Sequence, residues 1–92
     1  MPSSLINRNV ILNGRRTSVR LEPQMWDALI EIARREGRSV HEICSEVEAR
    51  RGQSTFAAGL RVYILSYYRA AATAEGHVRA GHGGRFASDM IG

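Results

Sequence analysis

Two arginines and a serine stand on alternate positions of the segment RRTSVRLEP, residues 15–23. In an extended strand, alternate side chains point to the same face, so Arg16, Ser18 and Arg20 would share one face. A guanidinium can donate two parallel hydrogen bonds to O6 and N7 of guanine or to a phosphate, and a serine hydroxyl can donate or accept. The spacing therefore suits a surface that recognises a polyanion through hydrogen bonds.

Positive charge is concentrated near the N-terminus. The 92 residues have a formal net charge of +4, and all basic residues other than histidine are arginines. Residues 1–20 contain no acidic residue, whereas residues 21–51 are nearly balanced between acids and bases. A basic patch of this kind favours a polyanionic partner over an acidic one.

One short strand and three helices are expected to position these residues. Thr17, Val19 and Leu21 alternate with the polar set and form the apolar face of the strand. Pro23 ends the strand and suits the first turn of a helix. The pattern then becomes helical up to Gly37, a typical helix stop.

The second and third helices follow from a capping signal and from apolar stripes. The segment SVHE places Ser39 and Glu42 as a capping box, and that helix should end near Arg50. The third helix should run from Ser54 or Thr55 to about Ala72. Its apolar residues occupy two faces, Phe56, Leu60, Ile64 and Tyr67 on one and Val62, Leu65 and Tyr68 on the other. A second copy of the chain is expected to cover one of these faces.

A lone strand exposes unpaired backbone groups along both edges. The simplest remedy is antiparallel pairing with the same strand of a second copy, which leaves Arg16, Ser18 and Arg20 facing outward. A two-stranded ribbon has the width that the major groove of DNA admits. The sequence therefore favours double-stranded DNA as the partner of a homodimer.

The order of these elements resembles the ribbon-helix-helix family of dimeric bacterial DNA-binding proteins. The resemblance is carried by RRTSVRLEPQMWDALIEIARREGRSVHEICSEVEARRG, and STFAAGLRVYILSYYR is similar to the third-helix extension of one subgroup; together they cover roughly residues 9–69. It implies a mainly α fold with one short N-terminal strand, an intertwined dimer and an intermolecular antiparallel β-ribbon. The implied function is a sequence-specific transcriptional regulator, in particular a repressor.

The resemblance also assigns roles to individual residues. Arg16, Ser18 and Arg20 match the strand positions that contact bases, and Ser39 and Val40 match the start of the second helix, which anchors a phosphate. A helix N-terminus attracts anions, in agreement with that role. Two arginines, Arg15 before the strand and Arg38 beside the second helix, are expected to add phosphate contacts. Glu22 departs from the family pattern and would weaken DNA binding unless it turns inward as a helix cap.

A second interpretation of the N-terminus competes with the dimeric ribbon. Asn13-Gly14 in VILNGRRT is the strongest signal for a two-residue hairpin turn, which would pair Val10 with Thr17 and Ile11 with Arg16. Hairpin and dimer ribbon together would give four strands about 4.8 Å apart, too wide to lie flat in a groove about 12 Å across. We therefore expect residues 1–13 to be an arm that folds back only partly or rearranges on DNA.

Other functions are disfavoured by the absence of their motifs. The chain has one cysteine, Cys44, and no catalytic triad, paired carboxylates or nucleotide-binding loop, so we expect no enzyme, no cofactor and no metal site. We expect no signal peptide and no membrane span, and thus a cytoplasmic protein. The expected organisation is an arm or partial hairpin at 1–14, a ribbon-helix-helix domain with a third helix at 15–72 and a flexible tail at 73–92.

Three alternatives stay open. The chain could be an antitoxin-type interaction module whose third helix and tail bind a partner protein. It could coat DNA without sequence preference. Its dimers could also associate into a tetramer through the third helix.

Overall fold

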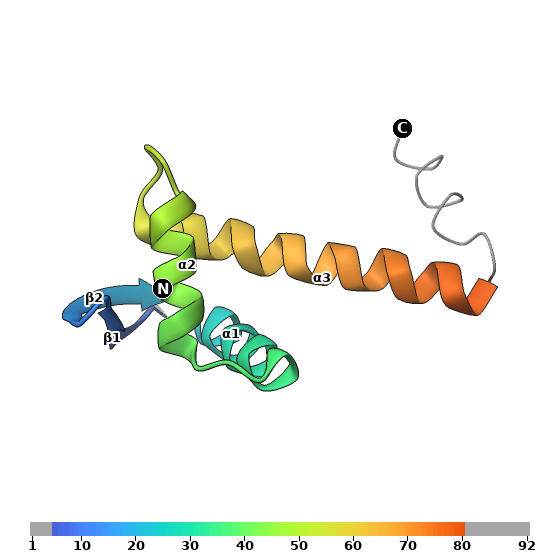
Figure 1. Cartoon of the computed structure of the whole chain (residues 1–92), viewed down its shortest axis with the longest axis horizontal. Coiled ribbons are helices and arrows are strands. Elements are labelled where there is room, and N and C mark those ends of the chain that lie inside the picture. The colour runs from blue at the N-terminus through green and yellow to red at the C-terminus, as the bar shows by residue number, and fades with distance from the viewer. Residues whose placement is uncertain (1–4, 81–92) are drawn as a thin grey trace.

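The computed structural model describes residues 5–80, with side chains through residue 73, as two strands followed by three helices (Figure 1). The elements are β1 (Ile6–Leu12), β2 (Arg15–Leu21), α1 (Pro23–Glu36), α2 (Val40–Arg50) and α3 (Phe56–Ala80). The expected fold class, mainly α with an N-terminal β segment, is confirmed.

The two strands form an antiparallel hairpin within one chain. Val10 pairs with Thr17 and Ile11 with Arg16, the register that the turn signal predicts. Asn13 has a φ of 52° and Gly14 a φ of 84°, and positive values at both positions define a type I′ turn. The assumption that β2 lacks a partner in its own chain is therefore wrong, and so is the expectation of only partial folding for residues 6–12. Residues 1–4 lie outside the described part.

Helices α1 and α2 begin and end where their signals predict. Gly37 ends α1 in the left-handed region with a φ of 67°, a conformation that costs glycine little. At the start of α2, the Glu42 amide donates to Ser39 Oγ over 3.1 Å, and the Ser39 amide donates to Glu42 Oε1 over 2.8 Å. The capping box is therefore complete.

The hydrophobic core lies between the inner face of the hairpin and the three helices. Helix α2 packs beside β1, and α3 packs against β2 as well as α1 and α2. Side chains from every layer are fully buried, including Leu21, Leu29, Ile32, Ile43 and Leu60. One chain thus closes its own core over the described residues.

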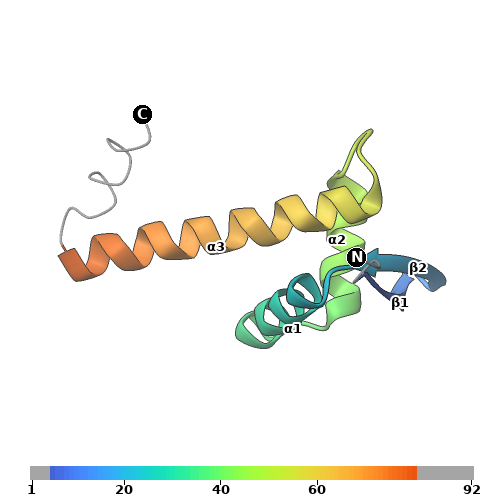
Figure 2. The same cartoon turned by 180° about the vertical axis from the view of Figure 1, so that it is seen from behind.

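Helix α3 has an inner and an outer face, and it extends past α1 and α2 (Figures 1 and 2). Leu60 and Ile64 are buried on the inner face, while Val62 and Leu65 on the outer face are 62% and 59% exposed. The inner contact is close, since a Cβ on Gly59 would lie 3.2 Å from Val47 Cγ1.

The helix continues to Ala80, beyond the end expected near Ala72; the remainder of the expected tail, residues 81–92, lies outside the described part. Within residues 5–80, no helix combines the length and apolar composition that a membrane crossing requires.

Candidate nucleic-acid interface

The outer face of β2 carries the three residues that the alternation singles out. Arg16, Ser18 and Arg20 are all exposed, whereas Val19 and Leu21 are buried on the inner face. Period-two alternation accounts for this division, because the inner face packs on the helices and the outer face meets solvent. The three side chains therefore project together from one side of the hairpin.

Strand β1 adds amide side chains to the same face. Directly opposite residues of an antiparallel pair share a face, so Asn9 stands beside Ser18 and Asn7 beside Arg20. Ser18 Oγ donates a hydrogen bond to Asn9 Oδ1 over 3.0 Å. Sequence reasoning missed these two asparagines, although their alternation with buried Val10 within INRNVIL was available as a signal.

The two edges of the hairpin differ. On β1, the Ile11 amide points away from β2 and donates to Nδ1 of His41 on α2 over 3.0 Å. In a hairpin with a two-residue loop, the residues on either side of the loop, here Leu12 and Arg15, form a hydrogen-bonded pair. The backbone N–H and C=O groups of alternate residues point to opposite edges of a strand, so those of Arg16, Ser18 and Arg20 point to the edge of β2 that faces away from β1. No described residue pairs with that edge.

The N-terminus of α2 lies beside β1 and offers backbone donors. The amides of Ser39 and Glu42 are occupied by the capping box. Of the first amides of α2, those of Val40 and His41 have no acceptor among the described residues. Backbone donors at a helix N-terminus bind anions, so these two amides, rather than that of Ser39, can take a phosphate oxygen.

Arg15 and Arg38, the two expected phosphate contacts, differ in their surroundings: Arg15 is exposed, whereas Arg38 is half-buried and paired with a carboxylate. Arg38 forms an ion pair with Glu46, at 2.7 Å between Nη1 and Oε1, and this bond raises the pKa of Arg38. Arg15 begins β2 on the helix-facing side. The hydrogen bond from Arg51 lowers the pKa of Glu48, and the charge of Arg15 adds a smaller effect in the same direction. A phosphate contact by Arg38 would compete with an existing carboxylate partner.

Glu22 turns inward, but not as a helix cap. Its carboxylate receives two hydrogen bonds from Arg61 on α3, at 3.1 and 3.2 Å. No side-chain cap bond forms at the start of α1. The Arg61 hydrogen bonds lower the pKa of Glu22, so the carboxylate stays ionised and its charge is neutralised away from the outer face.

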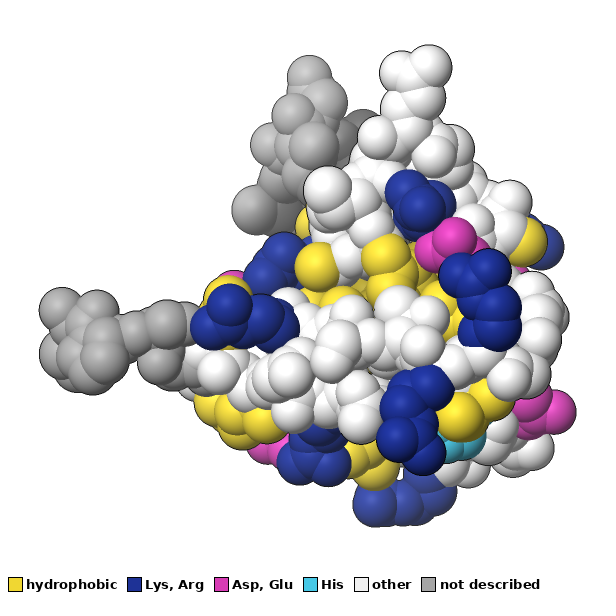
Figure 3. Space-filling view, turned by 90° about the vertical axis from the view of Figure 1, so that its left-hand side faces the viewer, with side chains coloured by type: hydrophobic (Ala, Val, Ile, Leu, Met, Phe, Trp, Pro, Cys, Tyr) yellow, Lys and Arg dark blue, Asp and Glu magenta, His cyan; other side chains and the backbone are white. Residues whose placement is uncertain are grey.

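Arginine side chains surround the end of the molecule that carries the hairpin. Figure 3 looks at this end and shows more dark-blue basic groups than magenta acidic groups. The outer face itself holds no acidic residue, since its members are Asn7, Asn9, Ile11, Arg16, Ser18 and Arg20. Its charge and donors suit a nucleic acid.

The described residues contain no cluster of side chains that could bind a metal ion. Among residues 5–80, no three side chains of the ligating types His, Cys, Asp and Glu come together. Cys44 is fully buried, and burial raises the pKa of its thiol to about 12. The thiolate that would act as ligand or nucleophile is therefore disfavoured.

Comparison with known sequences identifies the family. The sequence profile described as "Ribbon-helix-helix domain" matches residues 5–68. The chain belongs to the ribbon-helix-helix family. The match begins before β1, so both strands of the hairpin lie within the family domain. Ribbon-helix-helix proteins in general bind DNA and dimerise, and the described geometry fits this family fold.

A solved structure supports the fold of this ribbon-helix-helix chain. The chain is similar to an uncharacterized protein from Bordetella pertussis Tohama I, with 36% sequence identity and a TM-score of 0.61. The similarity covers 76% of this chain and 62% of that one, so this chain spans less than two thirds of the solved protein. No curated protein matches the sequence.

Proposed function

We propose that this ribbon-helix-helix protein is a sequence-specific DNA-binding transcriptional regulator that represses by occupying its operator. The observation that carries the proposal is the exposed row of Arg16, Ser18 and Arg20 on the outer face of a two-stranded ribbon. Arginine can donate to both acceptors of guanine in the major groove, and serine adapts to either base of a pair. The outer face is thus the base-contacting surface in this proposal.

Phosphate contacts beside this face would hold the ribbon in register. The first turn of α2, which carries the free amides of Val40 and His41, lies beside β1, where His41 Nδ1 accepts a hydrogen bond from the Ile11 amide. Contacts of this kind position a protein on DNA without reading sequence. In the proposal, Ser39 contributes its exposed hydroxyl, while Arg15 and Arg38 contribute positive charge near the same groove wall.

Two uncovered surfaces are available to join copies of the chain. The open edge of β2 could pair with the β2 of a second copy, as the predicted intermolecular ribbon requires. The outer face of α3, with Val62 and Leu65, could pack against the same face of another copy and account for a homodimer or a tetramer. We propose a homodimer as the DNA-binding species.

Selection of bound duplexes from a random pool tests the function. We expect a palindromic consensus with two half-sites for a dimer, or four half-sites for a pair of dimers. Affinity should fall steeply with salt, because each neutralised phosphate releases counterions. A pool that shows no enriched sequence, together with a footprint without discrete boundaries, would instead indicate sequence-independent coating.

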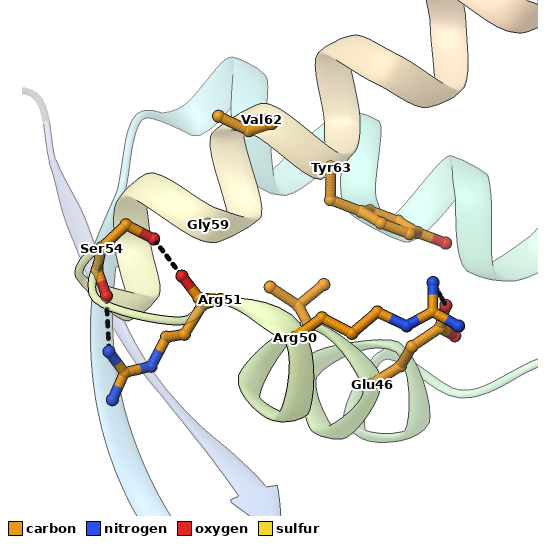
Figure 4. A pocket seen from close by; sticks show the side chains of 8 residues that line it. Glu46, Arg50, Arg51, Ser54, Gly59, Val62 and Tyr63 are labelled. Carbon is orange, nitrogen blue, oxygen red and sulfur yellow. Dashed lines mark hydrogen bonds and ion pairs between the residues drawn. The ribbon is translucent and has the colours of Figure 1, made fainter.

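A second candidate function is an antitoxin-type interaction module, and one observation favours it. A pocket of about 240 Å³ lies between the end of α2 and the start of α3 and reaches Val62 (Figure 4). Its other lining residues include Val47, Gly59 and Tyr63, so its floor is apolar. Recovery of a stoichiometric small protein that depends on residues 73–92 and on Val62 would support this function over the regulator.

A further inference from the structure

We propose that the pocket between the end of α2 and the start of α3 binds a small organic anion, a monocarboxylate carried on an apolar body. The inference goes beyond DNA binding and does not depend on it. Three features of the pocket carry it: an apolar lining, an unbalanced positive charge at one end, and a tyrosine hydroxyl that has no hydrogen-bond partner among the described residues.

The part of the pocket where the two helices meet is apolar. Val47 on α2 lies opposite Gly59 on α3, where an added Cβ would lie only 3.2 Å from Val47 Cγ1. Val62 also lines the pocket and is largely exposed (Figure 4). A ligand that covers these side chains removes apolar surface from water. The space of about 240 Å³ is smaller than the sites that hold drug-sized molecules, so it suits a small ligand.

The end of the pocket beside Glu46 carries one unbalanced positive charge. Glu46 Oε1 lies 2.7 Å from Arg38 Nη1, and Glu46 Oε2 lies 3.3 Å from Arg50 Nη1. One carboxylate therefore faces two guanidinium groups. Another lining residue, Arg51, is already paired with Glu48. The side chain of Arg50 is 78% exposed, and a guanidinium has five N–H donors, so donors remain for an anionic group.

The hydroxyl of Tyr63 supplies a neutral donor at the same end. Tyr67 and Tyr68 each donate to a glutamate of α1, whereas Tyr63 makes no such bond in the described part of the chain. Burial raises the pKa of Tyr63, and the nearby charge of Glu46 adds to this effect, so the hydroxyl stays protonated. Figure 4 shows the side chains of Tyr63 and Arg50 extending from their two helices toward Glu46. A ligand carboxylate placed there can accept from both.

The combination of groups selects the class of ligand. A carboxylate has a single charge and two acceptor oxygens, which match one guanidinium and one hydroxyl. An amine would meet the unbalanced positive charge of Arg50 instead of compensating it. The apolar body of the ligand would then lie along Val47 and Val62. Because Val62 belongs to the outer face of α3, the ligand would also lie beside the surface proposed to join copies of the chain.

Titration of the full chain with octanoate tests the site. We expect wild-type protein to bind one octanoate per chain, with a dissociation constant at or below about 1 mM. Octanamide, an uncharged analogue with the same apolar body, should bind at least about tenfold more weakly, because it lacks the charge-assisted hydrogen bonds. Calorimetry measures both affinities. The backbone amide resonances of Val47, Gly59 and Val62 should shift as octanoate saturates the site.

Variants at the polar end test the two donors. Tyr63→Phe keeps the ring and removes the hydroxyl, and Arg50→Gln removes the charge. Each should weaken octanoate binding about tenfold and change octanamide binding much less. Arg34→Gln removes an exposed arginine of α1 outside the pocket lining, and it should leave both affinities unchanged. Circular dichroism of each variant verifies that the helices remain folded.

Several outcomes would overturn the inference. One is the absence of saturable octanoate binding, and another is equal affinity for octanoate and octanamide. An equal loss in Arg34→Gln and Arg50→Gln would indicate attraction by net charge alone. If associated protein binds no octanoate, a second copy occupies the pocket, and capture of a small protein that depends on Val62, without octanoate binding, would assign the pocket to that protein. None of these results alters the selection of DNA sequences, so the proposed function is tested separately.

Discussion

The outer face of the hairpin and the outer face of α3 are both exposed, but they differ in chemistry. The hairpin presents guanidinium, hydroxyl and amide groups at Arg16, Ser18 and Asn9, all with free hydrogen-bonding capacity. Helix α3 presents Val62 and Leu65, which offer only apolar area. A polar, positively charged face is suited to bind a solvated polyanion. Exposed apolar side chains instead favour association, because covering them with another apolar surface lowers the free energy of the complex.

One small core therefore supports two surfaces for different contacts, a polar surface on the hairpin and an apolar surface on α3. Sequence alternation directs side chains outward from β2, and helical periodicity directs them outward from α3. Neither outer face contributes to the buried core, so each can be changed while the fold is retained. Variants that alter one face alone therefore test the division of roles.

The largest expected effect is a loss of stability when the inner face of α3 is changed, compared with little loss when its outer face is changed. Leu60→Ala should lower the free energy of unfolding by about 2–5 kcal/mol, because it removes a fully buried side chain and leaves a cavity. Val62→Ala, two residues away and exposed, should change it by no more than about 0.5 kcal/mol. Urea unfolding of both variants measures the contrast. Similar losses in the two would show that the outer face is covered in the folded protein.

Changes on the hairpin face should affect binding more than stability. Arg16→Ala or Arg20→Ala should each weaken specific DNA binding by about 1–3 kcal/mol and relax preference at particular base pairs. Arg34→Ala, an exposed arginine on α1, serves as a charge-matched control and should have a smaller effect. Fluorescence anisotropy on the selected duplex measures each affinity. Equal losses on specific and random DNA would assign the arginines to phosphates.

A charge on the outer face of α3 should weaken the association of copies without changing the stability of the single chain. Leu65→Glu should leave the midpoint of thermal unfolding of dilute protein nearly unchanged, because the side chain is largely exposed. It should disfavour association through α3, since burial of an unpaired carboxylate is costly. Sedimentation velocity of wild type and variant at several concentrations tests this. Identical association in both would move the interface away from α3.

The smallest expected effect concerns the ion pair between the hairpin end and α3. The Arg61 hydrogen bonds lower the pKa of Glu22, so the stabilisation is present above the unfolded-state pKa near 4.5 and is lost as pH falls through the lower folded-state value. Glu22→Gln should therefore reduce stability slightly at pH 7, with a difference that shrinks on acidification. Thermal unfolding at pH 7 and pH 3 checks the trend, and a deficit that grows at low pH would contradict it.

Local sequence signals predicted most of the fold because each element has a short-range cause. The alternation around Val19, the helix stop at Gly37 and the capping box at Ser39 each depend on a few neighbouring residues. The second strand was also signalled by Asn13-Gly14. The expectation of a dimeric ribbon opposes a complete hairpin, but the positive φ values at Asn13 and Gly14 show that the local turn chemistry determines the fold of this segment.

The candidate site was only partly predictable, since its remaining members depend on contacts between distant segments. Alternation alone placed Arg16, Ser18 and Arg20 outward. The position of Asn9 beside Ser18 follows only once the hairpin register is accepted. The Glu22 pair with Arg61 spans 39 residues of sequence, and no local pattern indicates it. The role of these residues in DNA contact stays a prediction.

The buried thiol of Cys44 simplifies fluorescent labelling of this protein. A thiol whose pKa is raised to about 12 is almost wholly protonated near neutrality and reacts slowly with alkylating dyes. A cysteine introduced at exposed Gln53 would therefore take up a maleimide fluorophore selectively, with no need to remove the native residue from the core. The wild-type interior thus makes the chain ready for site-specific labelling and for distance measurements between copies.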